Sequence, residues 1–266
     1  MLFAPLLAAV SPACAPKQLG RASGPERHYE IEVFAEFDTT GEGIDLSGYE
    51  HQQVHLRGHL LLVTTRAFRD GSEGDMLRFE SLEHAPSAEG PWVRSELSGM
   101  SVELRVFDTG EILAVRDAEH LAGAPRHGEV FDVLLPALSP VVPAVRPGDE
   151  SWRRTSWPFE VGYQRGWRNN LTALWKNEGI EDVELGRSAH LSYAGQLEGE
   201  GSDARMEAEV TIGGEVAGEV WMRTSDARLV RHELDWTRTV HASYSSGVEL
   251  EQAQHFVVSA RLVEVP

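Results

Sequence analysis

The stretch HYEIEVFAEF, residues 28–37, alternates apolar side chains with mostly acidic ones. One set of alternating positions is entirely apolar: Tyr29, Ile31, Val33, Ala35 and Phe37. Because successive side chains of a strand point to opposite faces, this pattern predicts a β-strand with one buried face and one solvated face. Strands of this kind are typical of antiparallel sheets that expose one side to water.

The same period of two recurs along most of the chain. It predicts strands near 54–66, 76–83, 101–107, 111–116, 188–198, 205–212, 217–224, 229–240 and 248–262. Turn sequences such as Asp70-Gly71 and Thr109-Gly110 separate several of these strands, and their glycines supply the positive φ that tight hairpins need. We therefore expect an all-β chain built from antiparallel meanders.

One segment departs from this period and has the spacing of a helix. Its apolar residues are Val130, Phe131, Leu134 and Leu135. They predict a single short helix near 129–135, which Pro136 should end because proline cannot continue the helical hydrogen bonding. The prolines that follow predict a stiff crossover near the middle of the chain.

The helix and crossover, 128–150, divide the chain into an N-terminal β unit, 28–127, and a C-terminal β unit, 151–266. The hairpin at 102–113 can be aligned with 218–229, which favours two related units. Two architectures therefore remain open: a half-barrel formed by one meander, or two related β units packed against each other.

The N-terminus resembles the front of an exported precursor. Residues 2–10 are uncharged and too few to span a bilayer as a helix, and the only cysteine of the chain, Cys14, follows them. We expect 1–13 to be a signal-like segment and 14–27 a linker. With a lipid on Cys14, the protein would be anchored at the periplasmic face of the cell envelope.

Two other interpretations of this segment stay open. Ala13-Cys14-Ala15 also fits an ordinary signal-peptidase site, which would release a soluble exported protein. Alternatively, the segment is a cytosolic tail with an incidental cysteine. The lipid on Cys14 is expected because the segment resembles a bacterial lipoprotein signal, with Ala13 before the cysteine. Pro12 departs from the pattern of such signals, and no basic residue precedes the apolar run.

Composition and motifs argue against several functions. The formal net charge is −18, from 24 basic and 42 acidic residues, and such a polyanion repels nucleic acid. The chain has no G-x-S-x-G, no phosphate-binding glycine loop and no H-E-x-x-H sequence. We expect no nucleic-acid partner, no enzymatic activity and no cofactor.

Histidines give one set of candidate metal ligands, and the acidic loops 38–45 and 178–184, which match no EF-hand spacing, are expected to be solvated turns. His51, His55 and His59 recur every four residues, but Arg57 lies among them on the same strand face. Strand residues four apart are separated by ~13 Å, which is too far to share one ion. We expect a polar strand face and no metal site. His232 shares an apolar face with its neighbours and is expected in the core.

Aromatic residues concentrate within 152–175. The candidate ligand-binding residues are Trp152, Trp157, Trp167 and Trp175. Flat rings give a large contact area at low entropic cost, so this set could line a groove for a lipid or a sugar. The alternative is that these rings fill the core where the crossover meets the sheet.

Pro136-Ala137-Leu138, Pro147-Gly148-Asp149, Trp152 and the Thr109-Gly110 hairpin resemble a family of uncharacterised lipoproteins of Gram-negative bacteria, over roughly 90–266. More distantly, the long meander resembles periplasmic half-barrel proteins that carry lipoproteins or lipids. The resemblance implies a non-catalytic envelope lipoprotein that binds an apolar ligand: a lipid, an acyl chain or another lipoprotein. The alternative is a structural or protein-interaction module with a filled core and no ligand.

Overall fold

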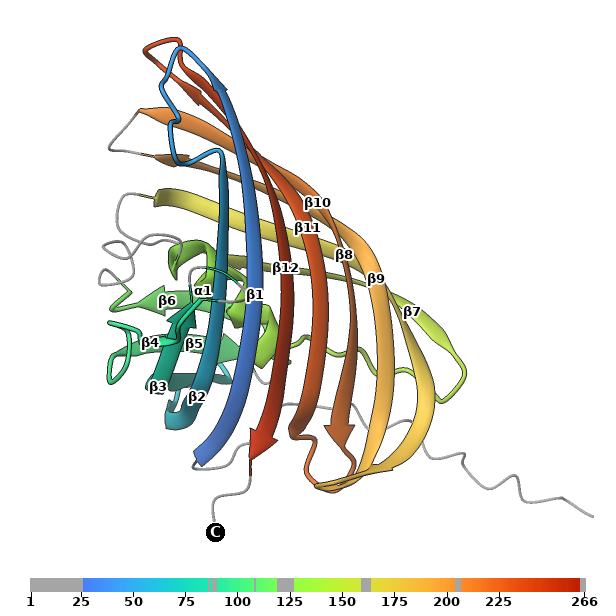
Figure 1. The fold of residues 1–266 in the computed structure, drawn as a ribbon. Helices are drawn as coiled ribbons and strands as arrows, with labels where there is room; N and C mark the ends of the chain where they lie inside the picture. Colours follow the sequence, from blue (N-terminus) through green and yellow to red (C-terminus); the bar gives the residue numbers. More distant parts are fainter. Residues whose placement is uncertain are drawn as a thin grey trace, which may run out of the picture.

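The computed structural model describes residues 26–85, 87, 90–107, 109–118, 127–158, 164–203 and 207–263. One antiparallel sheet curls around a short helix (Figure 1). The strands are β1 Glu26–Glu42, β2 His51–Ala67, β3 Ser72–Ala85, β4 Val93–Arg94, β5 Ser101–Phe107, β6 Ile112–Arg116, β7 Glu150–Pro158, β8 Gln164–Val183, β9 Gly186–Asp203, β10 Ala208–Arg223, β11 Leu229–Tyr244 and β12 Glu249–Val263. The helix is α1, His127–Leu138.

The strand order is β6-β5-β3-β2-β1-β12-β11-β10-β9-β8-β7, and β4 pairs with β3 beside this path. The first and last strands of the chain pair in the middle of the sheet, with Tyr29 opposite Leu262. The edge strands β6 and β7 approach each other, so the sheet forms a nearly closed barrel. This confirms the all-β prediction and selects the half-barrel over two packed units.

Helix α1 lies inside the curve of the sheet, against β11 and β12 (Figure 1). Its side chains from Val130 to Leu135 are buried, and the ring of Phe131 packs edge-on against Phe79 at a centroid distance of 6.1 Å. The predicted end at Pro136 is wrong, because Pro136 lies within the helix. Proline removes only one hydrogen bond in the last turn, and burial of Ala137 and Leu138 holds that turn in place. No helix in the described ranges is long and apolar enough to cross a membrane.

Glycines on the inner face allow the sheet to curl. A Cβ atom on Gly195 would lie 2.3 Å from the carbonyl oxygen of Thr172, and one on Gly214 would lie 2.2 Å from that of Thr237. Adjacent strands therefore approach closely at these positions. Glycine at such positions lets long strands coil into a barrel.

The core is the inner face of the sheet together with α1. Tyr29, Phe37, Trp236 and Phe256 are among its largest fully buried side chains. The predicted alternation holds along β1, where the apolar positions are buried and most glutamates are exposed. Strands β4, β7 and β8 were not predicted. In β8, Leu174 places an apolar residue among the polar positions of the alternating pattern.

Candidate functional site

A buried carboxylate connects α1 to the wall of the barrel. Asp132 is 1% exposed, and its Oδ1 atom accepts hydrogen bonds from Trp157 Nε1 at 3.1 Å and Asn169 Nδ2 at 2.8 Å. Its Oδ2 atom accepts one from Nη1 of Arg238 at 2.5 Å. Arg238 is 3% exposed, so this is an ion pair inside the core. The pair fixes the helix to β7, β8 and β11.

Polar side chains continue from this ion pair across the inner face. Arg238 Nε donates to Gln254 Oε1 at 2.5 Å, and Gln254 Nε2 donates to Gln252 Oε1 at 2.5 Å. Gln252 Nε2 then donates to the hydroxyl of Thr39 at 2.8 Å. The interior therefore contains a connected network in which these groups are hydrogen-bonded to one another.

His232 is buried, as predicted, and is hydrogen-bonded on both ring nitrogens. Its Nδ1 lies 2.8 Å from the carbonyl oxygen of Ala137, and its Nε2 lies 2.8 Å from the hydroxyl of Tyr193. Because a carbonyl can only accept, Nδ1 carries the hydrogen and Nε2 accepts from Tyr193. Gly218 leaves room for the Tyr193 ring, which a Cβ atom there would approach to 2.6 Å. Burial lowers the pKa of His232 to about 4.

This low pKa predicts a pH-dependent stability. In the unfolded chain His232 takes up its proton near pH 6.5, whereas in the folded chain it does so only near pH 4. The unfolded state therefore binds more protons in this window, and the free energy of unfolding should fall by about 3 kcal/mol as the pH drops through it. Urea unfolding across this pH range measures the loss.

The matched variant is His232→Gln, which can donate to Ala137 and accept from Tyr193 but cannot titrate. Its unfolding free energy should fall less steeply between pH 6.5 and pH 4 than that of the wild-type chain. Equal slopes for the two chains would show that His232 does not carry this pH dependence.

The structure brings together two of the four candidate tryptophans. Trp157 and Trp175 are both 3% exposed and line one small cavity beside His232 and Tyr193. Trp152 lies on the opposite face of β7 and is 67% exposed. The backbone of Trp167 belongs to β8, and its side chain lies outside the described part of the chain. Cys14 also lies outside the described residues.

The cavity at Trp157 and Trp175 holds about 30 Å³. That is the volume of a single water molecule, whereas ligand pockets measure roughly 300–1,000 Å³. A second cavity of about 30 Å³ lies near Tyr29 and Leu138. Around α1, the concave side of the sheet is thus filled by protein side chains.

The three regularly spaced histidines lie on the outer face of β2, as predicted. His51 hydrogen-bonds to Asp38 at 2.8 Å, and the ring of His55 packs against Phe34 at a centroid distance of 4.7 Å. His59 borders a groove in the outer surface. Among the residues that the structure describes, no group of histidine, cysteine and acidic side chains is arranged to hold a metal ion.

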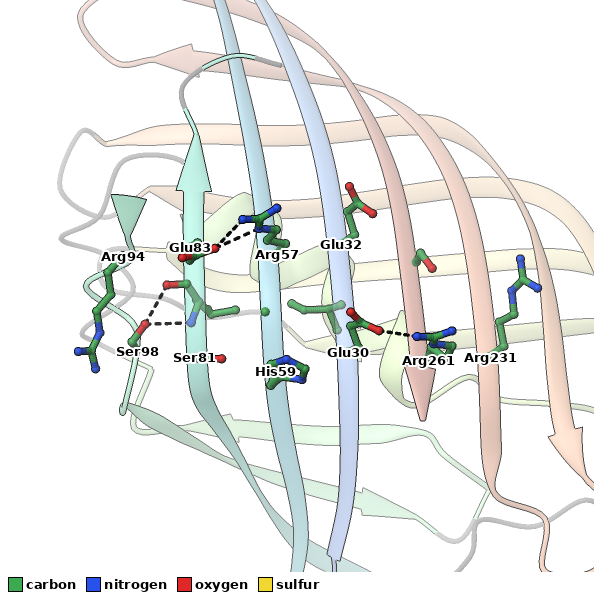
Figure 2. A pocket seen from close by; sticks show the side chains of 14 residues that line it. Glu30, Glu32, Arg57, His59, Ser81, Glu83, Arg94, Ser98, Arg231 and Arg261 are labelled. Atoms are coloured by element: carbon green, nitrogen blue, oxygen red, sulfur yellow. Dashed lines mark hydrogen bonds and ion pairs between the residues drawn. The ribbon is translucent and has the colours of Figure 1, made fainter. Parts of the chain in front are cut away.

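The groove beside His59 is the largest hollow that we find in the described surface, with a volume of about 920 Å³. It crosses the convex face over β3, β2, β1, β12 and β11, and Figure 2 shows its side chains spread across these strands. Four strand spacings of about 4.8 Å make it roughly 19 Å long. At Gly58, where β2 has no side chain, the groove reaches down to Ile31 and Leu82; the register to β3 shifts nearby, between His59 and Leu60.

Ion pairs fix many of the charged side chains along this groove (Figure 2). Arg57 donates from Nε and Nη2 to Glu83 at 3.0 and 2.9 Å, and its guanidinium lies 4.0 Å from the centre of the Trp92 ring. Arg261 pairs with Glu30 at 2.8 Å. Arg231 pairs with Glu233 just outside the groove.

Several polar groups of the groove remain available to a ligand. Arg94 and Glu32 are exposed and form no ion pair with any described residue. The hydroxyl groups of Ser81 and Ser259 add further donors and acceptors, whereas the hydroxyl of Ser98 is already hydrogen-bonded to the backbone N–H and carbonyl of Leu82. Sequence analysis did not identify this site, because its residues come from separate strands. The local signal was limited to basic residues, such as Arg57 and Arg231, at outward positions of the predicted strands.

No family model and no curated protein matches this chain. Among solved structures, the hypothetical lipoprotein YmcC from Escherichia coli K12 matches with 11% identity and a TM-score of 0.26, over 84% of this chain and 85% of that one. A triple mutant of the Rhodopseudomonas blastica porin matches with 7% identity and a TM-score of 0.25, over 88% and 99% of the two chains. YmcC is thus a distant structural neighbour, and at these TM-scores neither match supports an argument about function.

Proposed function

We propose that this protein is a non-catalytic module of the bacterial cell envelope, with a filled core, a lipid anchor on Cys14 and a surface that contacts its partners. One observation carries the proposal: the cavity beside the candidate tryptophans holds about 30 Å³. An acyl chain needs many times that volume. The filled-core alternative from the sequence is therefore favoured over the apolar carrier.

The burial of the inner face supports the same conclusion. Among the described residues, the large apolar side chains that remain exposed are Ile44, Tyr49, Val93, Met100, Trp152, Ile180 and Val257. All but Ile180, which lies near the end of β8 opposite Ala189, belong to loops or to the outer surface. Inner-face residues such as Phe37 and Trp236 are at most 1% exposed. An apolar ligand entering from solvent would have to displace packed side chains.

The buried titratable groups support a non-catalytic role. Asp132 is bound by Arg238 and two further donors, and both ring nitrogens of His232 are occupied. A second buried ion pair joins Arg27 to Asp75 at 2.9 Å, and burial lowers the pKa of Arg27. These groups hold the fold together, and the cavities that His232 and Arg27 line hold only about 30 Å³ each.

One experiment tests the anchor and the filled core together. The full-length chain is purified from membranes, and its mass is measured first under denaturing and then under native conditions. We expect the denatured mass to be that of a chain starting at Cys14 with covalent lipid. The native mass should be the same, because no apolar ligand is held inside.

The control is Cys14→Ser, which cannot carry the lipid and should no longer fractionate with membranes. A mature chain that starts elsewhere, or that lacks lipid, would overturn the anchor. A native mass that exceeds the denatured mass by that of a bound lipid would instead establish the apolar carrier and overturn the filled core.

A further inference from the structure

We propose that the convex-face groove binds an uncharged oligosaccharide, with Arg57, Glu32 and Arg94 among the residues that contact it. Neither the lipid anchor nor the filled core requires such a site, so this inference goes beyond the proposed function and can fail independently of it.

The shape of the groove suits a chain-like ligand. Its volume of about 920 Å³ lies in the range of small-molecule sites. It runs across neighbouring strands for roughly 19 Å, which is long enough for several sugar units. Because the strands beneath it are hydrogen-bonded into one sheet, the groove is preformed and a ligand need not order it.

The charges along the groove favour a neutral ligand. Four arginines and three glutamates line it, and the excess arginine is balanced because Arg231 pairs with Glu233 outside the lining. A polyanion would meet Glu32 and a net chain charge of −18, whereas a polycation would meet the arginines. The groove lining by itself therefore favours neither sign of charge.

The chemistry of the lining fits sugar hydroxyls. Each hydroxyl both donates and accepts, and the groove offers guanidinium donors, carboxylate acceptors and serine hydroxyls side by side. The double hydrogen bond to Glu83 and the Trp92 ring hold Arg57 in place, so little side-chain entropy is lost on binding.

The near absence of apolar side chains argues against other ligands. Among the described residues, Ile31 and Leu82 are the only large apolar residues that line the groove, and each is 1% exposed because it packs into the core. Peptide partners usually insert aromatic or aliphatic anchors into a pocket, and lipids require apolar area to bury. The groove provides neither feature.

The test uses the full-length chain in detergent and isothermal titration calorimetry with a defined set of probes. The neutral probes are maltoheptaose, cellohexaose and the N-acetylglucosamine hexamer, and dextran sulfate is the anionic probe. We expect saturable binding of at least one neutral probe that changes little with ionic strength, because no net charge is neutralised. Dextran sulfate should bind more weakly.

Two variants and a matched control locate the site. Arg57→Ala and Glu32→Gln should each raise the dissociation constant of the bound probe about tenfold, as expected for loss of one hydrogen bond to a charged group. Arg66→Ala is the control, because Arg66 also lies on β2, pairs with Glu103 and lies over the Phe68 ring, but outside the groove. It should leave binding unchanged.

Three outcomes would overturn the inference: no neutral probe binds, a neutral probe binds but both groove variants bind it as well as wild type, or dextran sulfate binds more tightly. The third result would make the groove an anion site. Unfolding curves of the variants are expected to match wild type, because exposed ion pairs contribute ~0–1 kcal/mol.

Discussion

The Asp132→Ala variant will unfold at a much lower urea concentration than the wild-type chain, with a loss of about 3–5 kcal/mol in the free energy of unfolding. The substitution leaves the guanidinium of Arg238 in the core, 3% exposed, without its carboxylate. It also removes the acceptor shared by Trp157 and Asn169. Since domains are stable by only about 5–15 kcal/mol, this loss is a large share of the total. Tryptophan fluorescence during urea titration measures it.

The control for this prediction removes both charges. Asp132→Leu combined with Arg238→Met leaves no buried ion, so the double variant should be more stable than Asp132→Ala by ~2 kcal/mol or more. Some loss will remain, because Trp157 and Asn169 still lack their acceptor. If Asp132→Ala were within ~1 kcal/mol of wild type, the ion pair would not be holding α1 in the barrel.

Gly214→Ala will destabilise the protein by ~3 kcal/mol or more, whereas Gly213→Ala, one residue earlier on the same strand, will change its stability by less than ~1 kcal/mol. The added Cβ at Gly214 would lie 2.2 Å from the carbonyl oxygen of Thr237 and 2.7 Å from the Cα of Arg238. These are backbone atoms, so β11 would have to move. At Gly213 nothing lies within 4 Å of the added atom. Urea unfolding of the two variants gives the comparison.

Gly195→Ala provides a second, independent position, because its Cβ would lie 2.3 Å from the carbonyl oxygen of Thr172 on β8. We expect it to behave like Gly214→Ala. If either variant proved as stable as Gly213→Ala, the curvature of the sheet would not depend on these close approaches. A variant too unstable to purify would agree with the expectation, provided that Gly213→Ala expresses normally.

The interior of the sheet and the groove on its convex face differ in their side chains and in their free volume. Around α1 the inner face contains apolar side chains, the Asp132 network and His232, and the two cavities that we find there hold about 30 Å³ each. The convex face has a polar groove of about 920 Å³. A lipid carrier would show the opposite arrangement, with free volume inside the curve of the sheet.

Much of the fold could be predicted from local pattern. The alternation at 28–37 correctly placed Tyr29 and Phe37 inside and Glu30 and Glu32 outside. The helical spacing of Val130 and Phe131 identified α1, although its end was predicted too early at Pro136. The 152–175 tryptophans could not be assigned to one site, because β7 turns Trp152 and Trp157 to opposite faces of the sheet.

By itself, the sequence determined which side chains are buried in most strands, since the period of two is a local property that needs no knowledge of neighbouring strands. The tertiary structure alone decided which strands became neighbours. Curling the sheet brought Asp132 within 2.5 Å of Arg238, 106 residues away, and pairing β1 with β12 set Glu30 beside Arg261. Such contacts depend on register and closure across the whole sheet. The filled interior and the charged groove therefore emerge only when the barrel forms.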